Sequence, residues 1–390
     1  MKQATLVIGL VGLLCIACAA DPRDAYDTAT ANTEARSTKS TAATTTTTQP
    51  EQHNVDSGKT SETATSDTPL ATTPQQKSAP DQENEVLAPF RGTPINPSDL
   101  YSPPLALKID NAPTALPQQG LQDADIVFEE LVEGGLTRFL AIFHSQIPTS
   151  VGPIRSGRST DIPLLMPFDG ALFGWSGSNW AFRKLLDTVA ITDVGLYRDP
   201  AHYWRQTERT SPSNLWVRAS QLANKEEHDP LTSEPLWPYE LSEDPMSSPT
   251  RQIKGIRIDW GSTKIEHVWD ATRSGWTRSQ NDDTHVVLDL NGEQQELAPA
   301  NVIIQFTKYV LTNEEDANGA RIPLGLVSEG SGTAWILKDG GIIEGRWNKA
   351  NVTVHTEFVD TEGHVIAMSP GSTWVLLAPR DSAEILEIDD

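Results

Sequence analysis

The sequence predicts an α+β domain followed by a mostly β domain, behind an N-terminal stretch that lacks the apolar residues needed to fold. Up to a Pro- and Ser-rich break at 231–252, strand-like and helix-like patterns alternate, and beyond it the patterns are mostly strand-like. All 11 tryptophans lie beyond residue 170, where the core is expected. The expected segments are a leader (1–20), a disordered linker (21–86), the α+β domain (87–245), the β-rich domain (246–380) and an acidic tail (381–390).

The leader resembles a bacterial secretion signal. One lysine precedes an apolar run at 4–17, which is too short for a stable membrane-spanning helix. Cys18 stands among small residues at the end of this run, as in a lipobox, although Cys15 occupies the place where leucine is usual. We therefore expect a lipid on Cys18 and an anchored protein at the extracytoplasmic face of a bacterial cell membrane. Ordinary signal-peptidase cleavage after Ala19 or Ala20 and an uncleaved membrane anchor are the alternatives.

The linker consists mainly of Thr, Ser, Ala, Glu, Gln and Pro, and Val55 is the only large aliphatic residue between Thr28 and Pro69. Such a composition cannot bury enough apolar surface to offset the entropy of ordering the chain. We expect a disordered tether that holds the folded part away from a membrane, as a passive spacer.

The elements of the α+β domain follow from short apolar runs and their flanking residues. Strands are expected at 104–110, 124–145 (two strands joined at Gly134-Gly135) and 171–175, and helices at 180–187 and 214–227. In the β-rich domain, strands are expected within 252–260, 285–291, 301–312, 334–347 and 372–379. The tail at 381–390 is expected to be solvated, because it is strongly acidic.

Composition and missing motifs exclude several function classes. The net charge of −23 disfavours a nucleic-acid partner, whose phosphates would be repelled. Neither metal-ligand spacings of Cys and His nor a glycine-rich phosphate or dinucleotide loop occurs, so no metal and no cofactor is expected. Both cysteines lie in the leader, which leaves none for a disulfide in the folded part. "GWSGS" at 174–178 misses the nucleophile elbow because Ser178 replaces its last glycine, so catalytic residues remain unknown.

Residues 134–160 of this acidic chain contain no acid and three arginines. Pro153 and the nearby glycines oppose a helix, which predicts a structured turn at the end of a sheet. Guanidinium groups bind carboxylate or phosphate with two hydrogen bonds, and the N–H groups of a Gly/Ser turn add donors. The candidate anion site comprises Arg138, Arg155, Ser156 and Arg158. Alternatively, these arginines attach the loop to the acidic hairpin beside it.

A two-residue loop at Gly134-Gly135 would pair Glu133 with Leu136 and place Arg138 diagonal to Glu129 and Glu133. Asp125, Glu129 and Glu133 would then share one strand face as supporting acids, which could equally be an ordinary salt-bridged surface. A shared metal ion is excluded, because Asp125 and Glu129 would lie about 13 Å apart along the strand.

A series of short motifs resembles the YerB-type lipoproteins, a bacterial family whose two domains have no assigned function. The motifs are Ile-Asp-Asn at 109–111, Pro-Gln-x-Gly-Leu at 117–121, Ala-Asp-Ile-Val at 124–127, Glu-Gly-Gly-x-Thr-Arg at 133–138 and Gly-Pro-Ile-Arg-Ser-x-Arg at 152–158. The similarity extends over about 87–380, although Ser213 replaces a histidine of the family pattern. It implies an N-terminal and a C-terminal family domain and surface anchoring, and it implies no activity.

Two function classes remain open. In the first, a tethered protein binds an anionic wall polymer, a lipid-linked precursor or a partner protein. In the second, an enzyme acts on a phosphorylated, lipid-linked envelope substrate. The second class draws on a loose resemblance to the LytR-CpsA-Psr glycopolymer transferases, in which a hairpin also leads into an arginine-bearing turn. A deep cleft beside Arg155 and Arg158 would distinguish the enzyme from the binding protein.

Overall fold

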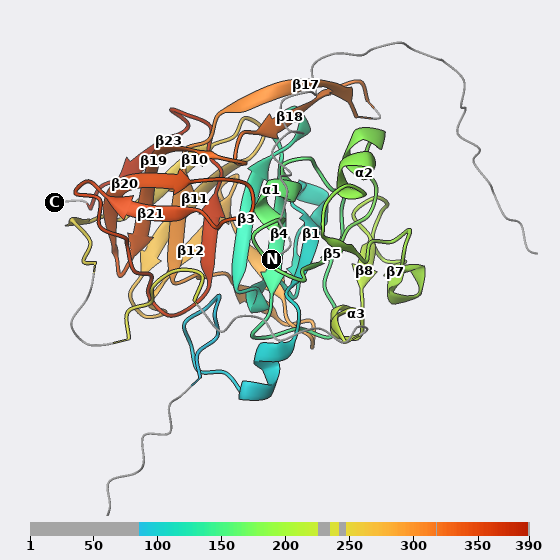
Figure 1. The fold of residues 1–390 in the computed structure, drawn as a ribbon, viewed down its shortest axis with the longest axis horizontal. Coiled ribbons are helices and arrows are strands. Elements are labelled where there is room, and N and C mark those ends of the chain that lie inside the picture. Colours follow the sequence, from blue (N-terminus) through green and yellow to red (C-terminus); the bar gives the residue numbers. More distant parts are fainter. Residues whose placement is uncertain (1–85, 225–234, 242–246, 317, 389–390) are drawn as a thin grey trace, which may run out of the picture. The chain divides into compact units, whose positions relative to one another are not determined.

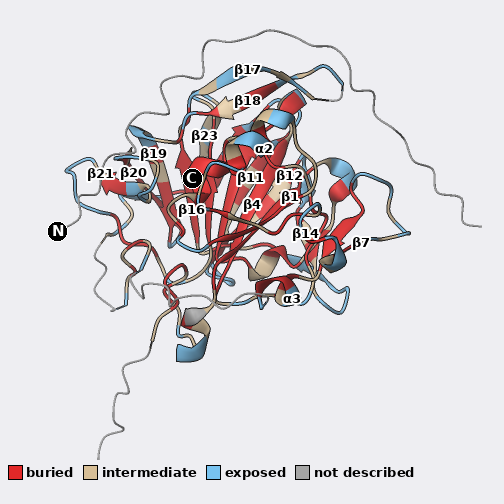
Figure 2. Cartoon of the chain, turned by 45° about the vertical axis from the view of Figure 1, so that its right-hand side comes forward, coloured by how far each residue is buried: buried red, intermediate tan, exposed pale blue. Residues whose placement is uncertain are grey.

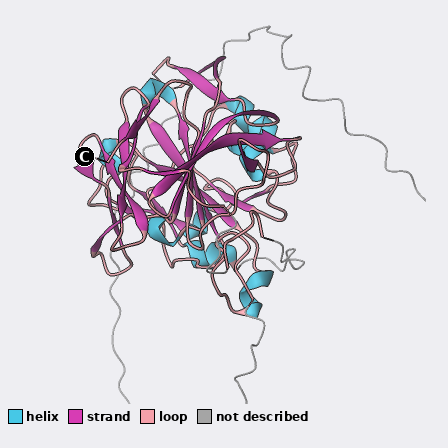
Figure 3. Ribbon diagram, turned by 90° about the vertical axis from the view of Figure 1, so that its left-hand side faces the viewer, coloured by secondary structure: helices cyan, strands magenta, loops and turns pink. Residues whose placement is uncertain are grey.

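The computed structural model describes residues 86–224, 235–241, 247–316 and 318–388, so the leader, most of the linker and Cys18 lie outside the described residues. Within the described part, strands dominate and the α-helices are short (Figure 1, Figure 3). The helices are α1 (Asp161–Leu165), α2 (Trp180–Leu186) and α3 (Ala219–Ala223), with 3-10 turns at Pro97–Tyr101, Pro113–Ala115, Leu121–Asp123, Glu133–Gly135 and Pro200–His202. None of the described helices is long and apolar enough to cross a membrane.

One mixed sheet runs through the folded part, in the order β21-β20-β19-β16-β22-β3-β4-β1-β5-β6, with β9 paired to β20. Its strands are β1 (Leu105–Asp110), β3 (Ile126–Leu131), β4 (Thr137–Phe143), β5 (Leu172–Gly174), β6 (Thr192–Asp193), β9 (Arg251–Gln252), β16 (Asn301–Gln305), β19 (Gly330–Lys338), β20 (Gly341–Lys349), β21 (Glu357–Asp360) and β22 (Thr373–Leu376). Because β22 pairs in parallel with β3, the segments before and after residue 246 share this sheet.

A second sheet has the order β13-β12-β11-β10-β23. Its strands are β10 (Gly255–Asp259), β11 (Lys264–Asp270), β12 (Gly275–Gln280), β13 (Asp283–Thr284) and β23 (Ala383–Leu386). The remaining strands are β2 (Gln118–Gln119), β14 (Val286–Leu288) and β15 (Gln294–Glu296) in one small sheet, and the pairs β7 (Tyr203–Arg205) with β8 (Leu215–Val217) and β17 (Tyr309–Glu315) with β18 (Arg321–Gly325).

The central strands are mostly buried (Figure 2), and alternation along them divides the apolar core into two clusters. Val127 and Phe139 face the second sheet and pack with Trp276 and Trp374 in one apolar cluster. Phe128 and Leu140 point to the opposite face and belong to a second cluster, which α1 and α2 help to cover. The central strands are therefore buried on both faces, and their polar residues must find partners inside the protein.

The predicted fold class is confirmed, with an α+β first part and a mostly β second part. The helix expected at 214–227 is wrong in its first half, because Leu215–Val217 forms β8 and the helix α3 begins only at Ala219. The expected tail is not wholly solvated either, since Ala383–Leu386 forms β23 and pairs with β10. In both places a short segment pairs with another strand, and local periodicity does not reveal that pairing.

The hairpin register predicted from a two-residue loop is wrong by one residue. Glu133, Gly134 and Gly135 form a 3-10 turn, and both glycines have positive φ, at 70° and 72°. The longer loop pairs Glu130, not Leu131, with Arg138. Because side chains alternate between faces, this shift places Glu129 and Arg138 on opposite faces of the sheet.

Candidate functional site

The three arginines of the acid-free segment meet at one edge of the main sheet. Asp110 ends β1 and lies opposite Arg138 at the start of β4. The loop after β4 returns across this edge, where the N–H of Asp110 donates to the Pro153 carbonyl (2.9 Å) and the N–H of Arg155 donates to the Lys108 carbonyl (2.8 Å). We call Arg138, Arg155, Arg158, Asp110 and Glu133 the arginine cluster.

Arg158 is attached to the hairpin by one carboxylate. Its Nε donates to Oε1 of Glu133 at 2.7 Å and its Nη2 donates to Oε2 at 2.8 Å, which is the bidentate geometry of a strong ion pair. Both side chains are buried. Burial opposes ionisation of Glu133, but the hydrogen bonds and charge of Arg158, together with the charge of Arg138, lower the pKa of Glu133 below its usual 4.5. The contacts of Arg158 therefore agree with the alternative hypothesis, in which an arginine attaches the loop to the acidic hairpin.

Arg138 lies beside this pair, and its positive charge is less well balanced by neighbouring acids. Its Nη1 donates to the Ser156 carbonyl (3.2 Å), and its Nη2 is 4.0 Å from Glu133. Burial, followed by the neighbouring charge of Arg158, lowers the pKa of Arg138 to about 10. A depressed guanidinium pKa means that the surroundings of Arg138 disfavour its positive charge, which an anion near it would relieve.

Arg155 is the accessible member of the cluster. Its side chain is 26% exposed, against 9% for Arg138 and Arg158, and its Nε lies 3.2 Å from Oδ2 of Asp110. The same Asp110 oxygen accepts a hydrogen bond from Ser213 (2.8 Å). Ser213, which replaces the histidine of the family pattern, thus contributes a hydroxyl at the edge of the cluster.

The backbone of the arginine loop is largely used for internal bonds. The N–H of Gly157 donates to the Gly177 carbonyl (3.1 Å), and the N–H of Arg158 donates to Asp161 (2.7 Å). Ser156 contributes its carbonyl to Arg138. Gly157 is required sterically, because a Cβ there would meet the ring of Phe182 from α2. An anion at this loop would therefore contact guanidinium groups rather than a nest of free N–H groups.

Asp125 and Glu129, expected as supporting acids, contact other groups. Asp125 accepts hydrogen bonds from the N–H groups of His144 (2.7 Å) and Ser145 (2.8 Å), and Arg91 lies 3.5 Å away. Glu129 faces the second sheet. Of the three expected acids, only Glu133 contacts the arginines of the cluster. Asp110, which was not expected there, is the second acid that contacts them.

A buried charge triad next to the cluster was missed by sequence reasoning. Lys108 on β1 forms ion pairs with Glu130 on β3 and, at 2.7 Å, with Asp161 at the start of α1, and all three side chains are inaccessible to solvent. Burial raises the pKa of Glu130 to about 7, against the charge of Lys108. The sequence feature that could have predicted this triad is the position of Lys108 and Glu130 in mainly apolar strands, because buried charged residues are usually paired.

A second buried network joins the two sheets. Nη2 of Arg278 on β12 donates to Glu129 (2.9 Å), and its Nη1 donates to Nδ1 of His285 (2.6 Å). Nε2 of His285 then donates to Gln118 (2.8 Å), which requires a neutral imidazole. This agrees with the pKa of His285, which burial and the charge of Arg278 hold well below its usual 6.5. The network is structural, because solvent does not reach it.

The fold and these sites define a protein with a central mixed sheet, shared by two sequence segments and crossed by buried ion networks. Among the described residues, no group of three or more His, Cys, Asp or Glu is placed to hold a metal ion. One cavity of the described part lies at the carboxyl ends of β5 and β6, and another is lined in part by Phe358 of β21. Arg155 and Arg158 line neither of these two cavities.

The chain belongs to a protein family of unknown function (DUF3048). Residues 91–232 match the N-terminal domain of this family and residues 256–375 match its C-terminal domain. The chain is 29% identical over 327 residues to "Putative lipoprotein YerB" of Bacillus subtilis (strain 168), which covers 80% of this chain and 92% of that protein. The crystal structure of the YerB protein from Bacillus subtilis is similar with a TM-score of 0.65 and 27% identity, over 77% of this chain and 99% of that chain.

Proposed function

We propose that this protein is a lipid-anchored, extracytoplasmic envelope protein that binds an anionic ligand at the arginine cluster. The anchor would be Cys18, with residues 21–86 as the spacer. The lipoprotein name of the Bacillus relative and the lipobox-like context of Cys18 support the anchoring. The ligand chemistry would be a phosphate or carboxylate of a wall polymer or a lipid-linked precursor.

The observation that carries the anion site is the charge balance around Arg155. Four cations gather here, Lys108 and the three arginines, and they face Asp110, Glu130, Glu133 and Asp161. Burial raises the pKa of Glu130, so this carboxylate offsets less positive charge than an exposed one would. Arg155 has the most exposed side chain of the four cations, so an anion arriving from solvent would meet it first.

Arg155→Ala should separate ligand binding from folding. Its contact with Asp110 is partly exposed, so we expect a stability loss of at most about 1 kcal/mol. With the parent protein, pyrophosphate near 100 times its Kd should stabilise the fold by about 2.7 kcal/mol, or about 5 °C in Tm. The variant should lose this shift. Thermal melting with and without pyrophosphate measures both effects.

Two further variants serve as controls for that experiment. Arg346→Ala removes an exposed arginine on β20 and should keep the full pyrophosphate shift. Arg158→Ala leaves Glu133 buried without its bidentate partner and should cost about 3–5 kcal/mol even without ligand. A parent Tm unaffected by pyrophosphate and by inorganic phosphate would mean that the cluster only holds the fold together.

Anchoring is tested separately. If Cys18 carries the lipid, Cys18→Ala should move most of the protein from the membrane fraction to the soluble fraction, or block its processing, when expressed in a bacterium. Cys15→Ala is the matched control and should leave fractionation unchanged, because the acylated residue is the one at the end of the apolar run. Membrane association of the processed Cys18→Ala variant at the parent level would contradict lipidation.

A further inference from the structure

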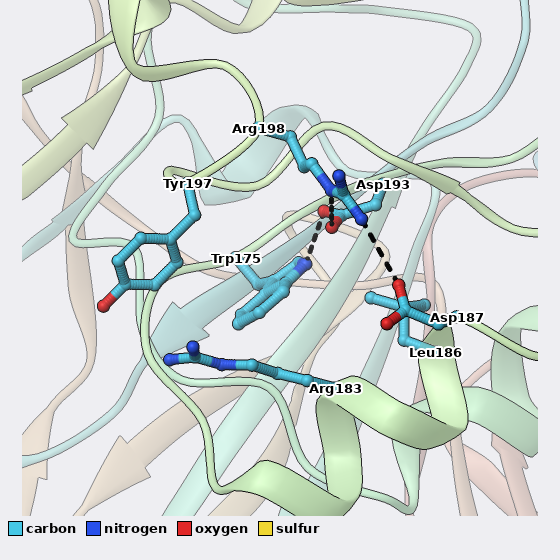
Figure 4. A pocket seen from close by; sticks show the side chains of 7 residues that line it. All are labelled: Trp175, Arg183, Leu186, Asp187, Asp193, Tyr197 and Arg198. Atoms are coloured by element: carbon cyan, nitrogen blue, oxygen red, sulfur yellow. Dashed lines mark hydrogen bonds and ion pairs between the residues drawn. The ribbon is translucent and has the colours of Figure 1, made fainter. Parts of the chain in front are cut away.

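A cavity of about 240 Å³ lies at the carboxyl ends of β5 and β6. Trp175 follows β5 directly, Asp193 ends β6, and α2 borders the opposite side. Its lining is Trp175, Arg183, Leu186, Asp187, Asp193, Tyr197 and Arg198 (Figure 4). Parallel strands that end side by side are a frequent place for ligand sites, because the loops that follow them diverge there.

Hydrogen bonds and ion pairs connect the polar groups of this cavity. Oδ1 of Asp193 accepts hydrogen bonds from the Trp175 indole (2.8 Å) and from the N–H of Gly195 (2.9 Å). Arg198 lies along one wall of the cavity, with Nε 3.4 Å from Asp193 and Nη2 3.3 Å from Asp187 (Figure 4). Carboxylate acceptors and guanidinium donors therefore alternate along one wall.

Exposed aromatic rings border the cavity. Tyr197 is 63% exposed, and the guanidinium of Arg183 lies 4.9 Å from its ring centre. Trp180, at the start of α2, is 73% exposed. Trp180 and Arg183 on α2 and its C-cap Asp187 are spaced i, i+3 and i+7, so they lie on one side of the helix over about 10 Å. Lys184 Nζ lies 5.0 Å from the Trp180 ring centre, which leaves the other face of this ring for a ligand.

We propose that this cavity and the adjoining face of α2 bind a neutral saccharide. The lining carries two arginines and two aspartates, so it offers no net charge to an anion. A vicinal diol both donates and accepts hydrogen bonds and matches a wall on which carboxylates and guanidinium groups alternate. Sugar rings also have apolar C–H faces that pack on Tyr and Trp rings, which combine an apolar body with a polar edge.

The size of the site agrees with this ligand class. The cavity is smaller than the roughly 300–1,000 Å³ of sites that enclose a drug-sized molecule, and it fits one sugar ring with its substituents. Trp180 lies outside the cavity on the same helix face and would support a second ring of the chain.

This inference is independent of the anion site, since it uses none of the residues of the arginine cluster. Isothermal titration of the full chain with chitotetraose and with cellotetraose tests it. We expect saturable binding of at least one of them, and a preference for chitotetraose would indicate recognition of the acetamido group. Tyr197→Ala should weaken binding about tenfold by removing a ring platform.

Arg198→Ala gives a second measurement if Tyr197→Ala fails to fold, because the Arg198 side chain is 62% exposed and its loss should leave the fold intact. Leu311→Ala, a change at a 60% exposed residue of the β17 strand, is the matched control and should bind as the parent does. The proposal is wrong if neither oligosaccharide binds at millimolar concentration, if both site variants bind as tightly as the parent, or if inorganic phosphate displaces the saccharide.

Discussion

Arg278→Met is expected to lower the free energy of unfolding by about 3–5 kcal/mol. The Arg278 side chain is inaccessible to solvent and lies 2.9 Å from Glu129, whose side chain is equally buried. Methionine fills a similar volume but leaves the Glu129 carboxylate without a cation in a low-dielectric interior. Because Glu129 belongs to β3 and Arg278 to β12, the loss should appear in the unfolding of the whole folded part. Urea unfolding followed by fluorescence of the tryptophans measures it.

Arg257→Met provides the matched comparison on the same sheet. Arg257 on β10 pairs with Glu266 and Glu384 at the surface, where all three side chains are at least 32% exposed. Exposed pairs contribute about 0–1 kcal/mol, so this variant should stay close to the parent. The double change Arg278→Met with Glu129→Gln should recover part of the stability, since it removes the unpaired buried charge of Glu129. Equal losses for Arg278→Met and Arg257→Met would show that the buried network adds nothing.

The strands were predictable because the signals that define them are local. The run at 104–110 is apolar and contains β1 at the expected place. The run at 301–312 was expected as strand and contains β16, but it breaks after Gln305, and β17 begins at Tyr309 in a separate pair and continues to Glu315. The pairing of β3 with β22 was not predictable in this way, because nearly 250 residues separate the two strands in the chain. Local patterns identify strands, whereas the order of strands in the sheet depends on contacts between distant segments.

The candidate site was predictable only in part, for a related reason. That Arg138, Arg155 and Arg158 come together followed from one strand and the loop after it. Their acidic partners depended on the hairpin register, and one additional loop residue moved Glu129 to the other face. Asp110 as the partner of Arg155 required knowing that β1 lies next to β4, which periodicity cannot supply.

Lys108→Met is expected to be at least as damaging as Arg278→Met. Lys108 is the cation between Glu130 and Asp161, and all three side chains have no exposed surface. Its removal leaves two buried carboxylates facing each other, so the loss should reach or exceed about 3–5 kcal/mol. Lys264→Met, at a 61% exposed lysine paired with Asp259, should cost about 0–1 kcal/mol and is the matched control.

The pH dependence of the Lys108→Met loss identifies its cause. Because burial raises the pKa of Glu130 from 4.5 to about 7, the native parent binds more protons than the unfolded chain between these values. The stability that comes from protonated Glu130 is therefore fully present below 4.5 and is lost as the pH rises through about 7. Without Lys108 the charged form of Glu130 is disfavoured further, so the variant should lose more stability at pH 8 than at pH 5. Urea unfolding of parent and variant at both pH values measures the difference, and adding Glu130→Gln should remove most of it. An equal loss at the two pH values would mean that Lys108 acts through packing of its aliphatic chain rather than through its charge.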